Sequence, residues 1–128
     1  TYGVLRGLHY QEPPFEQAKL VRVIKGSVLD VAVDIRQDSP TFGRHISVEL
    51  NDQNKKQLFI PKGFAHGFVV LSKTAVFAYK VDNYYNKESD RGIAFNDPGI
   101  GIDWKINPQD IKISLKDSSS ETFNFINY

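Results

Sequence analysis

Two histidines of this 128-residue sequence lie in surroundings where imidazole chemistry would matter. His9 stands in Gly-Val-Leu-Arg-Gly-Leu-His-Tyr-Gln and His66 in Pro-Lys-Gly-Phe-Ala-His-Gly-Phe, so each ring is embedded among small and apolar residues. Burial of a histidine shifts its pKa and demands a hydrogen-bonding partner. An imidazole so placed can act as an acid, a base or a metal ligand, although most histidines are surface residues or hydrogen-bonded core residues. The third histidine, His45, fits that commoner description.

The sequence disfavours a catalytic metal site at these histidines. The sequence contains no Cys, which removes thiolate metal sites, Cys nucleophiles and disulfide frameworks. It also contains no His-x-His, since Gln11 stands two residues after His9. Stable metal sites usually offer three or more protein ligands, so a lone imidazole is a poor one.

The segments that must position these residues have the pattern of strands. No stretch of about a dozen residues keeps apolar positions three and four apart without a Gly, Pro or Asn interruption. Residues 19–24 are rich in β-branched types, Gly26-Ser27 has hairpin-turn chemistry, and residues 28–35 alternate in character. These two strands are therefore predicted to be antiparallel neighbours. Further strands are predicted around residues 46–50, 57–60, 67–71, 75–80 and 93–95.

Short strands at regular spacing, with many turns and no crossover helices, predict an all-β fold: an antiparallel sandwich or jelly-roll barrel. The length of 128 residues predicts one compact domain over residues 1–128. The polar stretch 116–122 is predicted to be a surface excursion before the C-terminal Phe-Asn-Phe-Ile-Asn-Tyr.

The charge pattern limits the partners. The 16 Lys and Arg are balanced by 15 Asp and Glu and are scattered along the chain, which excludes a dedicated nucleic-acid binder but leaves a small anionic ligand open. No apolar run approaches the roughly 18 residues of a membrane-spanning helix, and the start does not resemble a signal peptide. We therefore expect no membrane association, and the absence of Cys favours a cytoplasmic location.

The motif Pro61-x-Gly63-x-x-His66 in a jelly roll resembles the second motif of the cupin superfamily. Within that superfamily, the sequence is similar to the dTDP-4-dehydrorhamnose 3,5-epimerases. The similarity rests on motifs that occur in order along nearly the whole chain: residues 3–11, 17–23, 30–36, 39–43, 60–68, 79–80, 96–98 and Ser114-x-Lys-Asp117. Members of the family have further upstream strands that reach the substrate site, so the resemblance implies that residues 1–128 lack those N-terminal strands.

The resemblance implies a cofactor-independent reaction. In this family, a 4-keto-6-deoxy sugar linked to dTDP is inverted at the two carbons that flank the ketone. Each inversion needs a base on one face of the sugar, an acid on the other, and a group that stabilises the enolate oxygen. By motif match, His9 is the base, held by Asp117, and Tyr79 is the acid. Lys19 is the candidate for the enolate oxygen, although without the motif it would be taken for a solvated lysine at a strand end.

The resemblance also implies a set of substrate contacts. Arg6 would pair with the diphosphate or the sugar hydroxyls, because its planar fork suits phosphate oxygens. His66 and Lys116 would be further polar contacts, and Asp90 stands where relatives often carry Glu. Tyr85, like Tyr84, could line the site or be a strand-surface aromatic.

Two structural expectations follow. Arg6 and His9 would point to opposite faces of a regular strand, so Gly7 is predicted to carry a bulge that brings both to one ligand. A homodimer is expected as well, because the family's N-terminal strands exchange between subunits and an open sheet edge needs covering.

Three other functions remain open from the sequence. A relative that inverts only one of the two centres would use the same His, Tyr and Lys. A non-catalytic jelly-roll module that binds sugar nucleotides should lack the base and the acid together, so the presence of both favours an enzyme. A metal-dependent cupin oxygenase is the third alternative.

Overall fold

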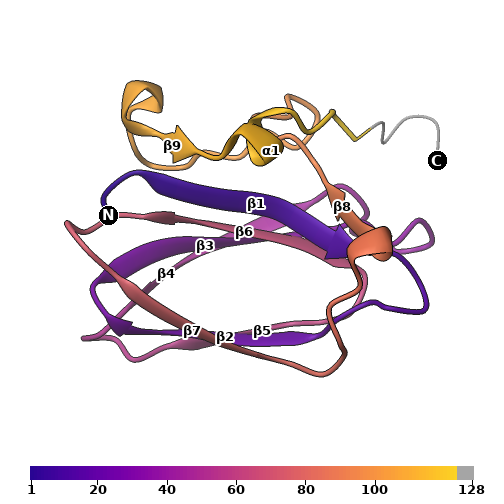
Figure 1. The fold of residues 1–128 in the computed structure, drawn as a ribbon, viewed down its shortest axis with the longest axis horizontal. Helices are drawn as coiled ribbons and strands as arrows, with labels where there is room; N and C mark the ends of the chain where they lie inside the picture. Colours follow the sequence, from indigo (N-terminus) through magenta and orange to yellow (C-terminus); the bar gives the residue numbers. More distant parts are fainter. Residues whose placement is uncertain (124–128) are drawn as a thin grey trace.

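Two β-sheets packed face to face make up most of the structure (Figure 1), which is a computed structural model that describes residues 1–123. The larger sheet has the order β4 (His45–Asn51), β3 (Ser27–Asp34), β6 (Phe64–Val70), β1 (Val4–Gln11) and β8 (Asp90–Gly92), with β9 (Lys112–Ile113) also paired to β1. The smaller sheet has the order β5 (Gln57–Ile60), β2 (Lys19–Lys25) and β7 (Val76–Val81). All strand pairs are antiparallel except the short pair of β1 and β9. The predicted all-β jelly roll is confirmed.

In the part of the chain that the structure describes, helical structure is limited to α1 (Leu115–Ser118) and two single 3₁₀ turns, η1 (Lys87–Ser89) and η2 (Pro108–Asp110). Within residues 1–123, no helix has the length and apolar character that a membrane crossing requires.

Strand β3 is buried on both faces and divides the core into two layers. Leu29, Val31 and Val33 pack on one side, in a cluster that includes Ile93 and Trp104 from the C-terminal part of the chain. On the other side, Val28 and Ala32 belong to a cluster between the two sheets that includes Val21 and Val23 of β2. The segment that carries β9 and α1 therefore covers the outer face of the larger sheet as a third layer (Figure 1).

The predicted hairpin of residues 19–24 and 28–35 is wrong. Strand β2 pairs with β5 and β7, whereas β3 pairs with β4 and β6, so the two strands lie in opposite sheets. Gly26, at φ +88°, turns the chain from one sheet into the other, and a Cβ there would meet the Thr74 carbonyl oxygen at 2.2 Å. Alternation along a strand shows that one of its faces packs against a core. The alternation pattern of two strands is the same whether they pair in one sheet or face each other from two sheets.

Two other expectations need correction. The strand predicted at residues 93–95 lies earlier, at Asp90–Gly92, because the ladder with β1 ends beside the distorted Gly7. Ile93 is apolar because it packs under the C-terminal layer. The stretch 116–122 is mostly exposed as predicted, but α1 turns the Asp117 side chain into the protein. Residues 124–128 of the C-terminal aromatic segment lie outside the described residues.

Candidate functional site

A bulge at Gly7 brings Arg6 and His9 to the same face of β1. Arg6 pairs with Phe68 and His9 pairs with His66, so β1 has one more residue than β6 between these two pairs. Gly7 has φ +129°, and a Cβ there would lie 2.6 Å from the Gly67 Cα. Only glycine tolerates this close approach and this backbone conformation. The predicted bulge is confirmed.

These residues face a cavity of about 660 Å³ that opens between the two sheets. Of the predicted site residues, those that line it are Arg6, His9, Lys19, His66, Tyr79, Tyr85, Asp90 and Lys116. The structure thus brings together residues from both sheets and from α1, and the remaining predicted residue, Asp117, lies behind His9.

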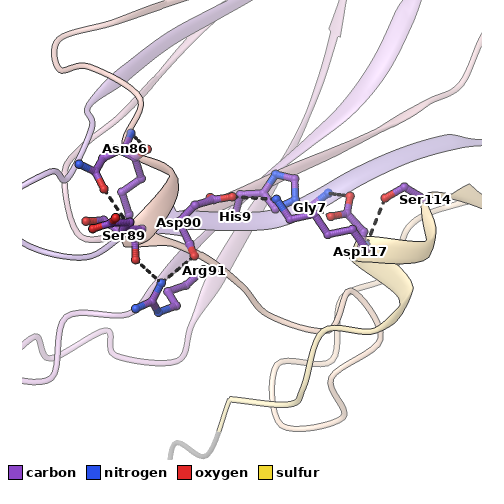
Figure 2. A network of polar contacts seen from close by, with 11 residues as sticks. Gly7, His9, Asn86, Ser89, Asp90, Arg91, Ser114 and Asp117 are labelled. Atoms are coloured by element: carbon purple, nitrogen blue, oxygen red, sulfur yellow. Dashed lines mark hydrogen bonds and ion pairs between the residues drawn. The ribbon is translucent and has the colours of Figure 1, made fainter.

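The His9 ring is held by Asp117 (Figure 2). His9 Nε2 lies 2.6 Å from Asp117 Oδ1, and the backbone N–H of Gly7 donates to Asp117 Oδ2 at 3.2 Å. Asp117 is buried at the start of α1, where the Ser114 hydroxyl caps the helix by accepting from the Asp117 N–H. Because a carboxylate only accepts, Nε2 is the donor in this contact, and in the neutral form of the ring Nδ1 carries the lone pair. The His9 side chain is 33% exposed and lines the cavity, so a ligand bound there can reach the ring.

A second histidine–aspartate pair lies beside the first and was missed as a site feature by sequence reasoning. His66 Nε2 lies 2.7 Å from Asp30 Oδ1, and both side chains are buried. The His66 ring also stacks on Phe77, with centroids 6.3 Å apart. An acidic residue in the middle of Val-Leu-Asp-Val-Ala-Val was the signal that could have found Asp30.

Lys19 begins β2 and is half-buried in the cavity wall. Burial lowers the pKa of its ammonium, and the negative charges of Asp30 and Asp90 oppose that effect. The site therefore holds a partly desolvated cation beside two carboxylates. Such a cation interacts strongly with negative charge that develops beside it.

The rim of the cavity carries the more exposed groups. Lys116 Nζ donates to Asp90 Oδ2 at 2.9 Å, and this hydrogen bond raises the pKa of Lys116. Tyr85 lines the cavity, whereas Tyr84 is 88% exposed and does not. Both tyrosines lie in the loop after β7, so neither is a strand-surface residue.

Gln11 is a further residue of the site that sequence reasoning left without a role. Its buried side chain donates to the carbonyl oxygens of Phe15 (2.6 Å) and Tyr84 (3.2 Å) and accepts from the Asn86 N–H (2.9 Å). It thereby ties the loop after β1 to the loop after β7. The other lining residues without a predicted role are Tyr10, Gln17, Phe68, Phe77 and Val81.

Metal coordination has little support in the donor set. Among residues 1–123, no three His, Asp or Glu side chains are grouped to hold one ion. His9 and His66 each give one ring nitrogen to a carboxylate.

Known proteins resemble this chain over nearly its whole length. Residues 1–124 match the sequence model of the dTDP-4-dehydrorhamnose 3,5-epimerase family. A protein of that name from Shigella flexneri is 54% identical over 123 residues, which are 96% of this chain and 67% of the relative.

Two crystal structures are similar in fold as well. The dTDP-4-dehydrorhamnose 3,5-epimerase of Elizabethkingia anophelis is 55% identical with a TM-score of 0.96, covering 100% of this chain and 70% of that one. The dTDP-6-deoxy-D-glucose-3,5-epimerase of Legionella pneumophila, solved with dTDP-4-keto-L-rhamnose, is 53% identical with a TM-score of 0.92, covering 98% of this chain and 65% of that one. The chain thus spans about two thirds of the length of these relatives, and by sequence and by fold it belongs to the dTDP-4-dehydrorhamnose 3,5-epimerase family.

Proposed function

We propose that the protein epimerises dTDP-4-dehydro-6-deoxy-D-glucose at C3 and C5 to give dTDP-4-dehydro-L-rhamnose, without a cofactor. The observation that carries this proposal is the placement of His9 and Tyr79 on different sheets that border one cavity. A sugar ring bound between the sheets would present one face to each residue. Inversion needs this arrangement, because the proton must leave from one face and return to the other.

His9 is the proposed base. Its Nδ1 lone pair takes the proton from C5 or C3, and Asp117, at 2.6 Å from Nε2, stabilises the imidazolium that forms. The electron pair of the broken C–H bond moves toward the ketone and leaves an enolate oxygen. Lys19 is the proposed partner of that oxygen, since a partly desolvated ammonium favours the charged intermediate over the neutral ketone.

Tyr79 is the proposed acid. It lies on β7, where it pairs with Val21 of β2, two residues from Lys19. Its hydroxyl gives a proton to the carbon from the face opposite His9, and solvent restores that proton. His9 returns its own proton to solvent, so the reaction is an isomerisation with no net change in atoms or charge.

The rim residues are proposed to hold the rest of the substrate. Arg6 and Lys116 supply positive charge for the diphosphate, and Arg6 can bind phosphate oxygens with two N–H groups. His66, Asp90 and Tyr85 are proposed as further contacts. The ligand in the Legionella relative supports a dTDP-linked sugar as the substrate class.

We also propose that the active form is a homodimer. Strands β5 and β7 are the edges of the smaller sheet in the part of the chain described by the structure, and uncovered edges favour pairing with another chain. Light scattering that shows a stable and active monomer would contradict this proposal.

Incubation with dTDP-4-keto-6-deoxyglucose in deuterated water, followed by NMR, tests the proposed function. Deuterium at both C3 and C5, with the L-rhamno product, supports it. Label and inversion at one centre would instead identify a single-centre epimerase. Binding of the sugar nucleotide without label at either centre would identify a non-catalytic binding module.

A further inference from the structure

Asp30 combines complete burial with an unused oxygen. It lies in the middle of β3 with 0% of its surface exposed, and its Oδ1 is 2.7 Å from His66 Nε2. Its Oδ2 is buried and has no hydrogen-bond partner among the described residues. A buried carboxylate oxygen without a hydrogen-bond donor lowers the free energy of unfolding, so Asp30 makes the folded protein less stable at this position.

The strand pattern turns the side chains of Lys19 and Asp30 toward the same space. Side chains two residues apart share a face of a strand, so Asp30 lies on the same face of β3 as Ala32, and Lys19 on the same face of β2 as Val21. Ala32 and Val21 belong to the one cluster between the sheets. Lys19 and Asp30 therefore both face the space between the sheets, where Lys19 and His66 line the cavity.

The charged and titratable groups around Lys19 come from every element that borders the cavity. They are Arg6 and His9 of β1, Asp30 of β3, His66 of β6, Tyr79 of β7, Tyr85 of the following loop, Asp90 of β8 and Lys116 of α1. Two of them are carboxylates that act on Lys19, and Asp90 is already hydrogen-bonded to Lys116 at 2.9 Å. Asp30 is the carboxylate with an oxygen still unpaired.

We propose that Asp30 is a positioning residue, whose Oδ2 keeps the Lys19 ammonium charged and directed into the cavity while its Oδ1 orients the His66 ring. Burial raises the pKa of Asp30 above its ordinary value, and the His66 hydrogen bond and the charges of His66 and Lys19 oppose that rise, so the effect between Lys19 and Asp30 is mutual. The importance of the Lys19 charge for turnover rests on the proposed function, whereas the Lys19–Asp30 coupling does not.

A titration of Lys19 tests the coupling without any turnover. Lysine amines are labelled by reductive ¹³C-methylation and followed by NMR, and the signal lost in Lys19→Arg identifies Lys19. Asp30→Asn should lower the pKa of Lys19 by about one, which is a rise of about tenfold in its acid dissociation constant. An unchanged pKa in Asp30→Asn would overturn the proposal.

Asp34→Asn is the matched control. Asp34 lies on the same strand and face and is equally buried, but it binds Arg36, Ser39 and Thr41. The Asp34→Asn variant should therefore leave the pKa of Lys19 unchanged. Should Asp30→Asn fail to fold, Lys19→Met gives the reciprocal measurement: the pKa of the Asp30 carboxyl, read by ¹³C NMR, should rise, and no change would overturn the proposal.

Kinetics then test the consequence for the reaction. Asp30→Asn should lower kcat about tenfold or more with a smaller change in KM, and the alkaline fall of kcat should move to lower pH, because the ammonium is lost earlier. Equal effects on kcat and KM with no shift of the pH profile, as expected for Asp34→Asn, would mean that Asp30 is merely structural. If the unchanged protein shows no turnover, the proposed function fails while the titration still decides the coupling.

Discussion

His9 and His66 lie directly opposite each other in the ladder of β1 and β6, and each is bonded through Nε2 to its own buried aspartate. Their exposure separates them: the His9 side chain is 33% exposed, whereas that of His66 is 8% exposed. Proton transfer requires contact with the reacting carbon, so the more accessible ring is the better base. The buried ring is suited to fixed hydrogen bonding at the cavity wall.

Variants of His9 and Tyr79 should separate proton removal from inversion. Tyr79→Phe keeps His9, Asp117 and Lys19, so the enolate still forms and His9 returns a proton to the face it came from. This variant should exchange substrate hydrogen with deuterated solvent while making little inverted product. His9→Ala should do neither, and each loss should be on the order of a hundred- to ten-thousand-fold.

NMR of the recovered substrate measures both rates in the same sample. Equal loss of exchange and inversion in Tyr79→Phe, or continued exchange in His9→Ala, would show that the two roles are reversed or misplaced.

Lys19→Ala should reduce rate more than affinity. Removing one stabiliser of a developing oxyanion typically costs about 2.7–4 kcal/mol, or roughly a hundred- to a thousand-fold in kcat. Steady-state kinetics give the comparison, because a group that acts in the transition state changes kcat and kcat/KM together. Near-normal kcat with a raised KM would make Lys19 a simple binding contact.

Gly7→Ala should disrupt the bulge. The added Cβ would meet the Gly67 Cα at 2.6 Å and the His66 carbonyl oxygen at 2.9 Å, both of them backbone atoms. Gly101→Ala is the control, because Gly101 also has positive φ (+71°) but no atom within 4 Å of an added Cβ. We expect the control to lose about 1 kcal/mol of unfolding free energy and to keep its activity.

Gly7→Ala should lose more stability than Gly101→Ala, and most of its turnover as well, because Arg6 and His9 no longer share a face. Denaturant unfolding and kinetics measure the two effects. Equal stability losses in the two variants would show that the close approach at Gly7 is not limiting.

Asp34 should stabilise the fold in a pH-dependent way. Burial alone would raise the pKa of Asp34, but hydrogen bonds from Arg36, Ser39 and Thr41 outweigh burial and hold the pKa well below its usual range. A carboxyl with a lower pKa in the folded state stabilises the protein fully above the unfolded value of about 4, and the effect fades as the pH falls toward the folded value.

The difference in unfolding free energy between the unchanged protein and Asp34→Asn should therefore be large at pH 7 and shrink below about pH 4. Urea denaturation at several pH values measures it. A difference that stays constant down to the lowest pH at which the protein folds would contradict this account.

The amino-acid sequence by itself determined the fold class and pointed to many of the residues that line the cavity. Alternation and turn chemistry depend on local geometry, so the strands at Gln57–Ile60 and Val76–Val81 were found nearly to the residue. The ordered motifs identified His9, Lys19 and Tyr79, and the three-residue spacing of Arg6 and His9 required the bulge at Gly7 that the structure contains.

The tertiary structure alone decided which strands pair and which carboxylates reach the cavity. Strands β2 and β3 are consecutive in the chain but lie in opposite sheets, and alternation cannot distinguish these cases because both arrangements bury one face of each strand. The position of Asp30 depends on two long-range arrangements of β3. Pairing of β3 with β6 brings Asp30 to His66, and packing of β3 against β2 turns it toward the side of the cavity where Lys19 lies. The local sequence marks Asp30 as an acid within an apolar strand, but its partners come from long-range packing, which no local pattern records.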